Sequence, residues 1–179
     1  MPGRTPKEAV ESYAQPIRET LACVTDAIVG YNGGVYPAAS NHTLCFANAP
    51  VGRLFGTDLY LFFSQNYSLL QSSEGEQEWK VRTEGYFYRV DDEDGSEIIC
   101  YHWHPYRDLV KYPHMHLKQK GSGITRPELE RAHIPTGRIS IETVVLFLER
   151  EFGVKPRGER WREKVERNLE IFERHRSWA

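Results

Sequence analysis

The chain has 179 residues, of which 40% are hydrophobic and 27% charged, as is typical of one soluble globular domain spanning 1–179. Its net charge of -2 does not favour a general nucleic-acid binder, and no apolar run approaches the roughly 18 residues of a transmembrane helix. Because the N-terminus lacks a signal-peptide pattern and the three cysteines are widely scattered, we expect a cytoplasmic protein without a disulfide framework or thiolate metal site.

Residues 5–31 have the pattern of an amphipathic helix. The segment Thr5-Pro6-Lys7-Glu8 combines a capping box with proline at the first helical position. Pro16 falls inside the pattern and predicts a kink or two short helices. The apolar stripe has spacings of three and four and consists of Val10, Tyr13, Ile17, Leu21, Val24 and Ile28.

An antiparallel meander of four or five strands is expected between residues 58 and 118. The preceding segment 32–56 is rich in Gly, Pro, Asn and Ala and predicts only a short strand near Thr43–Phe46. Within the meander, Gly85 indicates a bulge, and Asp92–Gly95 has the composition of a hairpin turn. The expected strands are Leu59–Ser64, with Tyr67–Gln71 as another strand or its continuation, Glu78–Asp91, Glu97–His104 and His114–Lys118.

Two helices are expected at the C-terminal end, over 140–153 and 158–177. Ser140 can cap the first, and Gly153 and Pro156 end it. The second carries an apolar stripe, and its other faces alternate Glu and Arg as on a solvated surface. Helices at both ends with a sheet between them predict an α+β domain.

Histidines are concentrated in two mirrored motifs, His102-Trp103-His104-Pro105 and Pro113-His114-Met115-His116. Side chains two residues apart on a strand point to the same face. If these strands pair antiparallel with the connecting loop centred on Leu109, His102 lies opposite His116 and His104 opposite His114. Trp103 and Met115 then pair on the other face, and four imidazoles share one patch.

Such a patch is compatible with a metal site. Imidazole is the commonest metal ligand in proteins, and an all-histidine set favours Zn or another borderline metal over Mg or Ca. This hypothesis takes His102, His104, His114 and His116 as the ligand pool of a metal-binding enzyme. Packed and hydrogen-bonded sheet histidines without a function remain the alternative.

The same residues are also compatible with metal-independent RNA cleavage. One imidazole removes a proton from a ribose 2′-hydroxyl and a second protonates the leaving oxygen. His114 and His116, with His102 or His104, would take these roles, while Arg138 or Lys118 steadies the phosphate. Tyr101 offers a stacking surface for an unpaired base.

The segment 132–138 connects the sheet to the first C-terminal helix. Pro135 and Gly137 shape a tight connection, as in an ordinary loop between a strand and a helix. Its functional interpretation is an anion site made by His133, Thr136, Arg138 and main-chain amides at the helix start.

Residues 78–153 resemble the small bacterial TumE-like toxins of toxin–antitoxin pairs. The matching features are Tyr86-Phe87-Tyr88, an acidic turn ending in Asp94-Gly95, an apolar return strand, the Pro113–His116 element and an amphipathic helix. The resemblance implies a cytoplasmic toxin neutralised by a cognate DNA-binding antitoxin, with Pro113, His114 and His116 as the matching motif positions. The whole chain is also similar to actinobacterial proteins carrying Tyr-His-Trp-His-Pro and His-x-Pro-Thr-Gly-Arg elements.

Three functions therefore remain open: a toxin-like ribonuclease, a metal-binding enzyme, and a non-catalytic interaction module of a toxin–antitoxin-type pair. The expected partners are an RNA substrate and an antitoxin protein. The sequence contains no helix-turn-helix signature and no basic stripe, which argues against direct reading of DNA by this chain.

Overall fold

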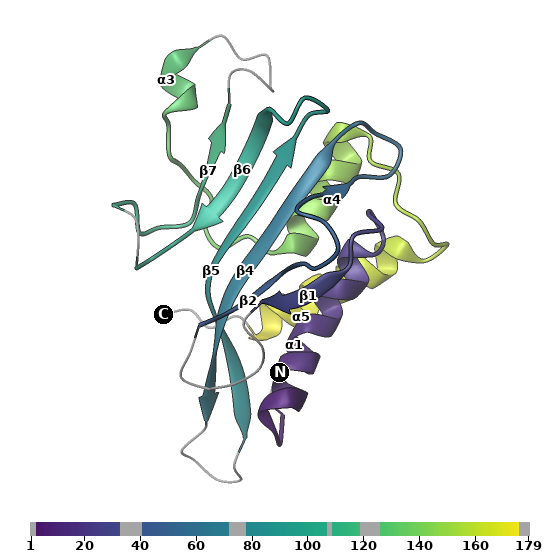
Figure 1. Cartoon of the computed structure of the whole chain (residues 1–179), viewed down its shortest axis with the longest axis vertical. Helices are drawn as coiled ribbons and strands as arrows, with labels where there is room; N and C mark the ends of the chain where they lie inside the picture. The colour runs from purple at the N-terminus through teal and green to yellow at the C-terminus, as the bar shows by residue number, and fades with distance from the viewer. Residues whose placement is uncertain (1–2, 33–40, 72–77, 107–108, 119–125, 176–179) are drawn as a thin grey trace.

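A computed structural model describes residues 3–32, 41–71, 78–106, 109–118 and 126–175. The predicted α+β class is confirmed, because helices from both ends of the chain pack on one antiparallel sheet (Figure 1). The helices are α1 (Pro6–Leu21), α3 (Pro127–Glu130), α4 (Ile141–Phe152) and α5 (Trp161–His175). No helix in the described part of the chain combines the length and apolar character needed to cross a bilayer.

The sheet has eight strands rather than the four or five expected. Its order is β1-β2-β4-β5-β6-β7-β8, with β3 paired to β4. Of the additional strands, His42–Phe46 matches the short strand predicted near Thr43–Phe46, and Val29–Asn32 comes from the end of the predicted N-terminal helix. The other two, Gly52–Arg53 and Ile134–Pro135, have only two residues each, too few to reveal a strand by alternation. The strands are β1 (Val29–Asn32), β2 (His42–Phe46), β3 (Gly52–Arg53), β4 (Tyr60–Gln71), β5 (Trp79–Asp91), β6 (Glu97–Trp103), β7 (His114–Leu117) and β8 (Ile134–Pro135).

Helix α1 begins as predicted, since the Thr5 hydroxyl accepts a hydrogen bond from the Glu8 amide at 3.2 Å. It passes Pro16 without dividing into two helices, but the predicted extension to residue 31 is wrong. The helix ends at Leu21, and Val29–Asn32 pairs with β2 instead. Val24 fits the apolar spacing because its side chain is buried, although it lies in the turn that follows α1. Ile28, the last residue of the predicted stripe, is 63% exposed.

The long β4–β5 hairpin contains the bulge that Gly85 predicted. The register shifts between Asn66 and Tyr67, because Asn66 pairs with Gly85 and Tyr67 with Thr83. A Cβ at position 85 would lie 2.6 Å from the main-chain oxygen of Trp103 on β6. Glycine therefore allows β5 and β6 to approach closely beside the histidine motif.

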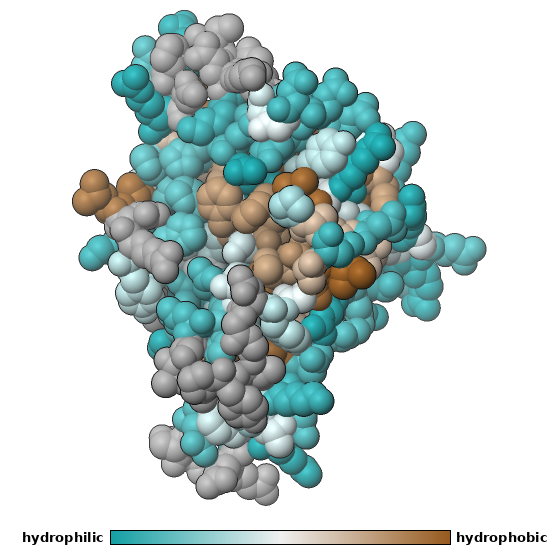
Figure 2. Space-filling model, viewed as in Figure 1, coloured by the Kyte–Doolittle hydropathy of each residue, from teal (hydrophilic) through white to brown (hydrophobic). Residues whose placement is uncertain are grey.

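Helices α1, α4 and α5 lie together on one side of the sheet (Figure 1). The sheet face toward them is aromatic: Phe63 and Tyr88 stack with ring centroids 5.6 Å apart, and Tyr101 meets Phe147 of α4 edge-on. Each fully buried side chain of this size contributes roughly 1.5–3 kcal/mol. Figure 2 shows apolar side chains in the middle of the face seen in that view, surrounded by hydrophilic ones.

The C-terminal helices lie close to their expected positions. The Ser140 hydroxyl caps α4 by accepting from the Thr143 amide at 3.1 Å, and Gly153 ends the helix in the left-handed region with φ 69°. Helix α5 begins at Trp161, three residues after its expected start, and the expected residues 176–177 lie outside the described part.

Candidate metal centre

Strands β6 and β7 bring the two histidine motifs together in a register that differs from the prediction. His102 pairs with His114, and Cys100 pairs with His116, so the predicted pairs His102–His116 and His104–His114 are wrong. The predicted pair Trp103–Met115 is wrong too, since Tyr101 is the partner of Met115. The difference is two residues, and side chains alternate with a period of two, so the histidines still share one face.

Three histidine rings converge on this face. One nitrogen from each of His102, His114 and His116 lies within 4.8 Å of the others. The ring centroids are 4.0 Å apart for His102 and His114, 4.9 Å for His102 and His116, and 5.0 Å for His114 and His116. This arrangement is compatible with one ion shared by three imidazoles.

His133 is the fourth ring beside this cluster. Its centroid lies 4.8 Å from that of His114 and 4.5 Å from that of His116. Strand β8 explains its position, because Ile134 pairs with Met115 and His133 directly precedes Ile134 in the chain. The sequence placed His133 in the segment that connects the sheet to the first C-terminal helix, and the two-residue strand beside it left no readable pattern.

His104 lies outside the cluster, on the other side of His102. Strand β6 ends at Trp103, and the His104 ring is 5.5 Å from His102 and stacks at 6.3 Å on Phe87. The structure therefore does not bring the four predicted ligands together: it groups His102, His114 and His116, with His133 in place of His104.

The tautomer of His114 is fixed by its neighbours. Its Nδ1 lies 2.8 Å from the main-chain oxygen of Tyr112, which only accepts, so Nδ1 carries the hydrogen. Its Nε2 therefore carries a lone pair. This atom is buried and has no hydrogen-bond partner among the described residues, on a side chain with 0% exposure. Metal-binding histidines commonly donate from the other ring nitrogen to a carbonyl in this way.

His102 and His116 contact each other directly, with their Nε2 atoms 2.8 Å apart, so one of them donates a hydrogen to the other. The Nδ1 of His116 is buried without a hydrogen-bond partner in the described part of the chain. Burial, followed by the neighbouring His133 and His114, lowers the pKa of His116 to about 4. At neutral pH this imidazole is uncharged, the form in which it binds metal.

The other predicted site residues divide between the two faces of the sheet. Lys118 follows β7 on the histidine side, and its charge helps to lower the pKa of His116. The remaining three lie with the helices: the Arg138 guanidinium is 4.0 Å from the centre of the Trp103 ring, Tyr101 packs on Phe147, and Thr136 lines a groove with Met115. The structure therefore does not place these three residues at the histidine patch, where they were expected to contribute to one site.

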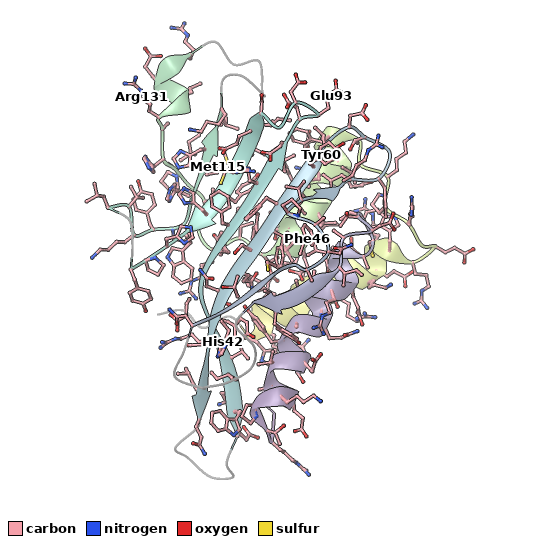
Figure 3. The ribbon with its side chains drawn as sticks, viewed as in Figure 1. His42, Phe46, Tyr60, Glu93, Met115 and Arg131 are labelled. Atoms are coloured by element: carbon pink, nitrogen blue, oxygen red, sulfur yellow. The ribbon has the colours of Figure 1, made fainter. Side chains whose placement is uncertain are left out.

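Cys100 and His42 are also possible metal ligands by residue type, but neither belongs to the cluster. Cys100 lies on the same face, but burial raises the pKa of its thiol, which disfavours the thiolate that would bind a metal. His42 is far from the cluster: Figure 3 shows it at the opposite end of the sheet from Met115 of β7. All three cysteines, each in the described part, are free, as expected.

No family model, curated protein or solved structure matches this chain. The geometry of its residues therefore defines the candidate site. The sequence identified three of the histidines but missed the Tyr112 carbonyl, because the mirrored motif carries no signal for a hydrogen bond between residues two positions apart.

Proposed function

We propose that the chain binds one borderline divalent metal ion, zinc foremost, through His102, His114 and His116. The carrying observation is the buried Nε2 of His114, which faces two other imidazoles and has no hydrogen-bond partner among the described residues. An orphaned lone pair in a buried site is costly, and a metal ion would satisfy it.

The separations of the nitrogens fit this proposal after small side-chain rotations. Zinc binds imidazole nitrogen at about 2.0–2.1 Å, which sets tetrahedral ligand atoms about 3.3 Å apart. The Nε2 atoms of His102 and His116 are 2.8 Å apart, so this pair would open by about half an ångström and lose its shared hydrogen. The nitrogen of His114, within 4.8 Å of the others, would move closer.

We further propose that the bound ion acts in hydrolysis. Three histidine ligands that leave one position for water are typical of catalytic zinc, whereas structural zinc has four protein ligands. His102 and His116 are half-buried, so water and substrate can reach the ion from their side. The ion would lower the pKa of its bound water toward 7 and supply hydroxide as the nucleophile. Lys118 on the same face favours an anionic substrate such as a phosphodiester of RNA.

The test of this function is hydrolysis of single-stranded RNA by protein purified without a histidine tag. We expect cleavage with added zinc, loss of cleavage in EDTA, and recovery when zinc is returned. Removing one ligand in His102→Ala should abolish the zinc-dependent rate, while His104→Ala should retain it. Zinc binding without cleavage of RNA would limit the proposal to the metal site and direct the search to other esters.

Metal-independent cleavage of RNA is the second candidate. The hydrogen-bonded pair His102–His116 favours it, because a donor and an acceptor imidazole lie side by side. The low pKa of His116 weighs against it, since a general acid must be protonated at the working pH. Cleavage that persists in EDTA and is lost in His116→Ala would establish this candidate instead.

The toxin function implied by the resemblance to TumE-like toxins, and the antitoxin partner that goes with it, remain predictions. They imply that expression of the chain slows growth and that a partner protein relieves the effect. A growth assay that compares the wild-type chain with His102→Ala separates a toxic activity from a non-catalytic interaction module, which the substitution would leave active.

A further inference from the structure

The sheet face that carries the histidine cluster lies opposite the layer of α1, α4 and α5 (Figure 1). Phe87 of β5 belongs to this face, because it pairs with His102 and its ring meets the His102 ring edge-on at 5.9 Å. It is half-buried and is not part of the hydrophobic core. The ring of His104 and the guanidinium of Arg89 lie beside it, at 6.3 and 6.0 Å from its centre. All three are planar groups on which nucleic-acid bases stack.

A second aromatic ring lies on another side of the cluster. Tyr112 precedes β7, and its ring meets that of His114 edge-on at 5.7 Å. The main-chain oxygen of Tyr112 orients His114, a role that any residue at this position would fulfil. Its side chain is 47% exposed, so packing within the protein does not account for a large ring here. The fold therefore presents one accessible ring beside His114 and another beside His102.

The charge around the cluster suits an anionic ligand. Burial, followed by basic neighbours that include Lys118, lowers the pKa of His116, so the local field at this ring is positive. Lys111, next to Tyr112 in the chain, is exposed. The carboxylate of Asp91 is paired with Arg89 at 2.8 Å, which offsets its charge. Aromatic rings combined with positive charge are the features with which proteins bind single-stranded nucleic acid.

We propose that this face selects single-stranded RNA, with the base on one side of a phosphodiester stacked on Tyr112 and the base on its other side stacked on Phe87. Tyr112 contacts His114, Phe87 contacts His102, and the two histidine rings are 4.0 Å apart, so a phosphodiester at the cluster has a ring on either side. Bases of a single strand splay apart readily, whereas those of a duplex are held by pairing and stacking. The position of the phosphodiester rests on the proposed function, but stacking on the two rings needs no ion.

Fluorescence anisotropy of the full chain in EDTA measures this binding without the ion. The probe is a fluorescein-labelled oligoadenylate of 2′-O-methyl RNA, in which the hydroxyl that metal-independent cleavage requires is blocked. Two further probes are the same strand in a duplex and an abasic strand of equal length, which keeps the phosphates and lacks the bases. We expect the single strand to bind at least tenfold more tightly than either. Equal binding of the abasic strand would attribute the affinity to charge alone and overturn the proposal.

Variants assign the stacking to the two rings. Tyr112→Leu and Phe87→Leu each replace a ring by an apolar side chain and should weaken the single strand about tenfold, without changing the affinity for the abasic strand. Phe55→Leu is the matched control and should bind as wild type, because this half-buried ring lies under Arg157 beside β3, which β4 and β5 separate from β6.

Circular dichroism establishes that each variant is folded. Unchanged binding of the single strand by folded Tyr112→Leu or folded Phe87→Leu would overturn the proposal. The result is independent of the metal centre, since EDTA is present throughout. A chain that binds the strand through both rings but takes up no zinc would contradict only the proposed function.

Discussion

The Nδ1 atom of His114 lies 2.8 Å from the main-chain oxygen of Tyr112, two residues earlier in the chain. This hydrogen bond places the ring hydrogen on the outer nitrogen and the lone pair on Nε2, which faces the other histidines. The orientation comes from the backbone and needs no second side chain. It gives the cluster one preorganised ligand before any ion arrives.

The low pKa of His116 predicts a pH dependence of stability in the metal-free protein. The unfolded chain takes up a proton below pH 6.5, and the folded chain does so only near pH 4. Between these values the unfolded state binds more protons, so the free energy of unfolding falls as the pH falls. The loss per pH unit is below about 1.4 kcal/mol, because solvent screens a half-buried ring.

Urea denaturation in EDTA at pH 7, 5.5 and 4.5 measures this effect. His116→Gln removes the titrating group, so the wild type should lose more stability than the variant between pH 7 and pH 4.5. Equal losses in the two proteins would show that His116 titrates normally.

The cap of α4 predicts a defined stability loss. In Ser140→Ala the amide of Thr143 loses its acceptor at 3.1 Å, and we expect the free energy of unfolding to fall by about 1 kcal/mol. Ser96→Ala, in the β5–β6 turn, serves as the control and should change stability by less than about 0.5 kcal/mol. A similar urea midpoint for Ser140→Ala and wild type would refute the role of this cap.

The close approach at Gly85 predicts a cost for any side chain there. In Gly85→Ala the new Cβ would lie 2.6 Å from the oxygen of Trp103, which belongs to the backbone and cannot rotate away. We expect β5 and β6 to separate locally, with a loss of about 1–3 kcal/mol. Thermal melting measures this change, and an unaltered melting temperature would contradict it.

Local signals made much of the fold predictable. The capping residues Thr5 and Ser140, the bulge at Gly85 and the turn after Asp91 each act within a few residues, and the structure contains all of them. The end of α1 was not predictable, because Val24 keeps the helical spacing while it is buried by tertiary packing. Short strands such as β3 and β8 are stabilised by their partners and leave almost no pattern.

The candidate site could be predicted in composition but not in register. The spacing of two within each motif placed the histidines on one face, and this survives a shift of two residues. The choice between His104 and His133 depends on where β6 ends and on the pairing of β8, both of which are set by contacts distant in sequence. Arg138 was expected beside the histidines, but its contact with Trp103 holds it on the helix side.

Metal content measured by elemental analysis tests the central claim most directly. Untagged wild-type protein, His104→Ala and His102→Ala are each loaded with zinc and dialysed at pH 7.5, and circular dichroism establishes that they are folded. We predict about one equivalent of zinc in wild type and in His104→Ala. His102→Ala loses a ligand, so we expect its affinity for zinc to fall by about a hundredfold or more and its zinc content after dialysis to be lower. No zinc in the wild type, or equal zinc in all three proteins, would contradict a centre built from His102, His114 and His116.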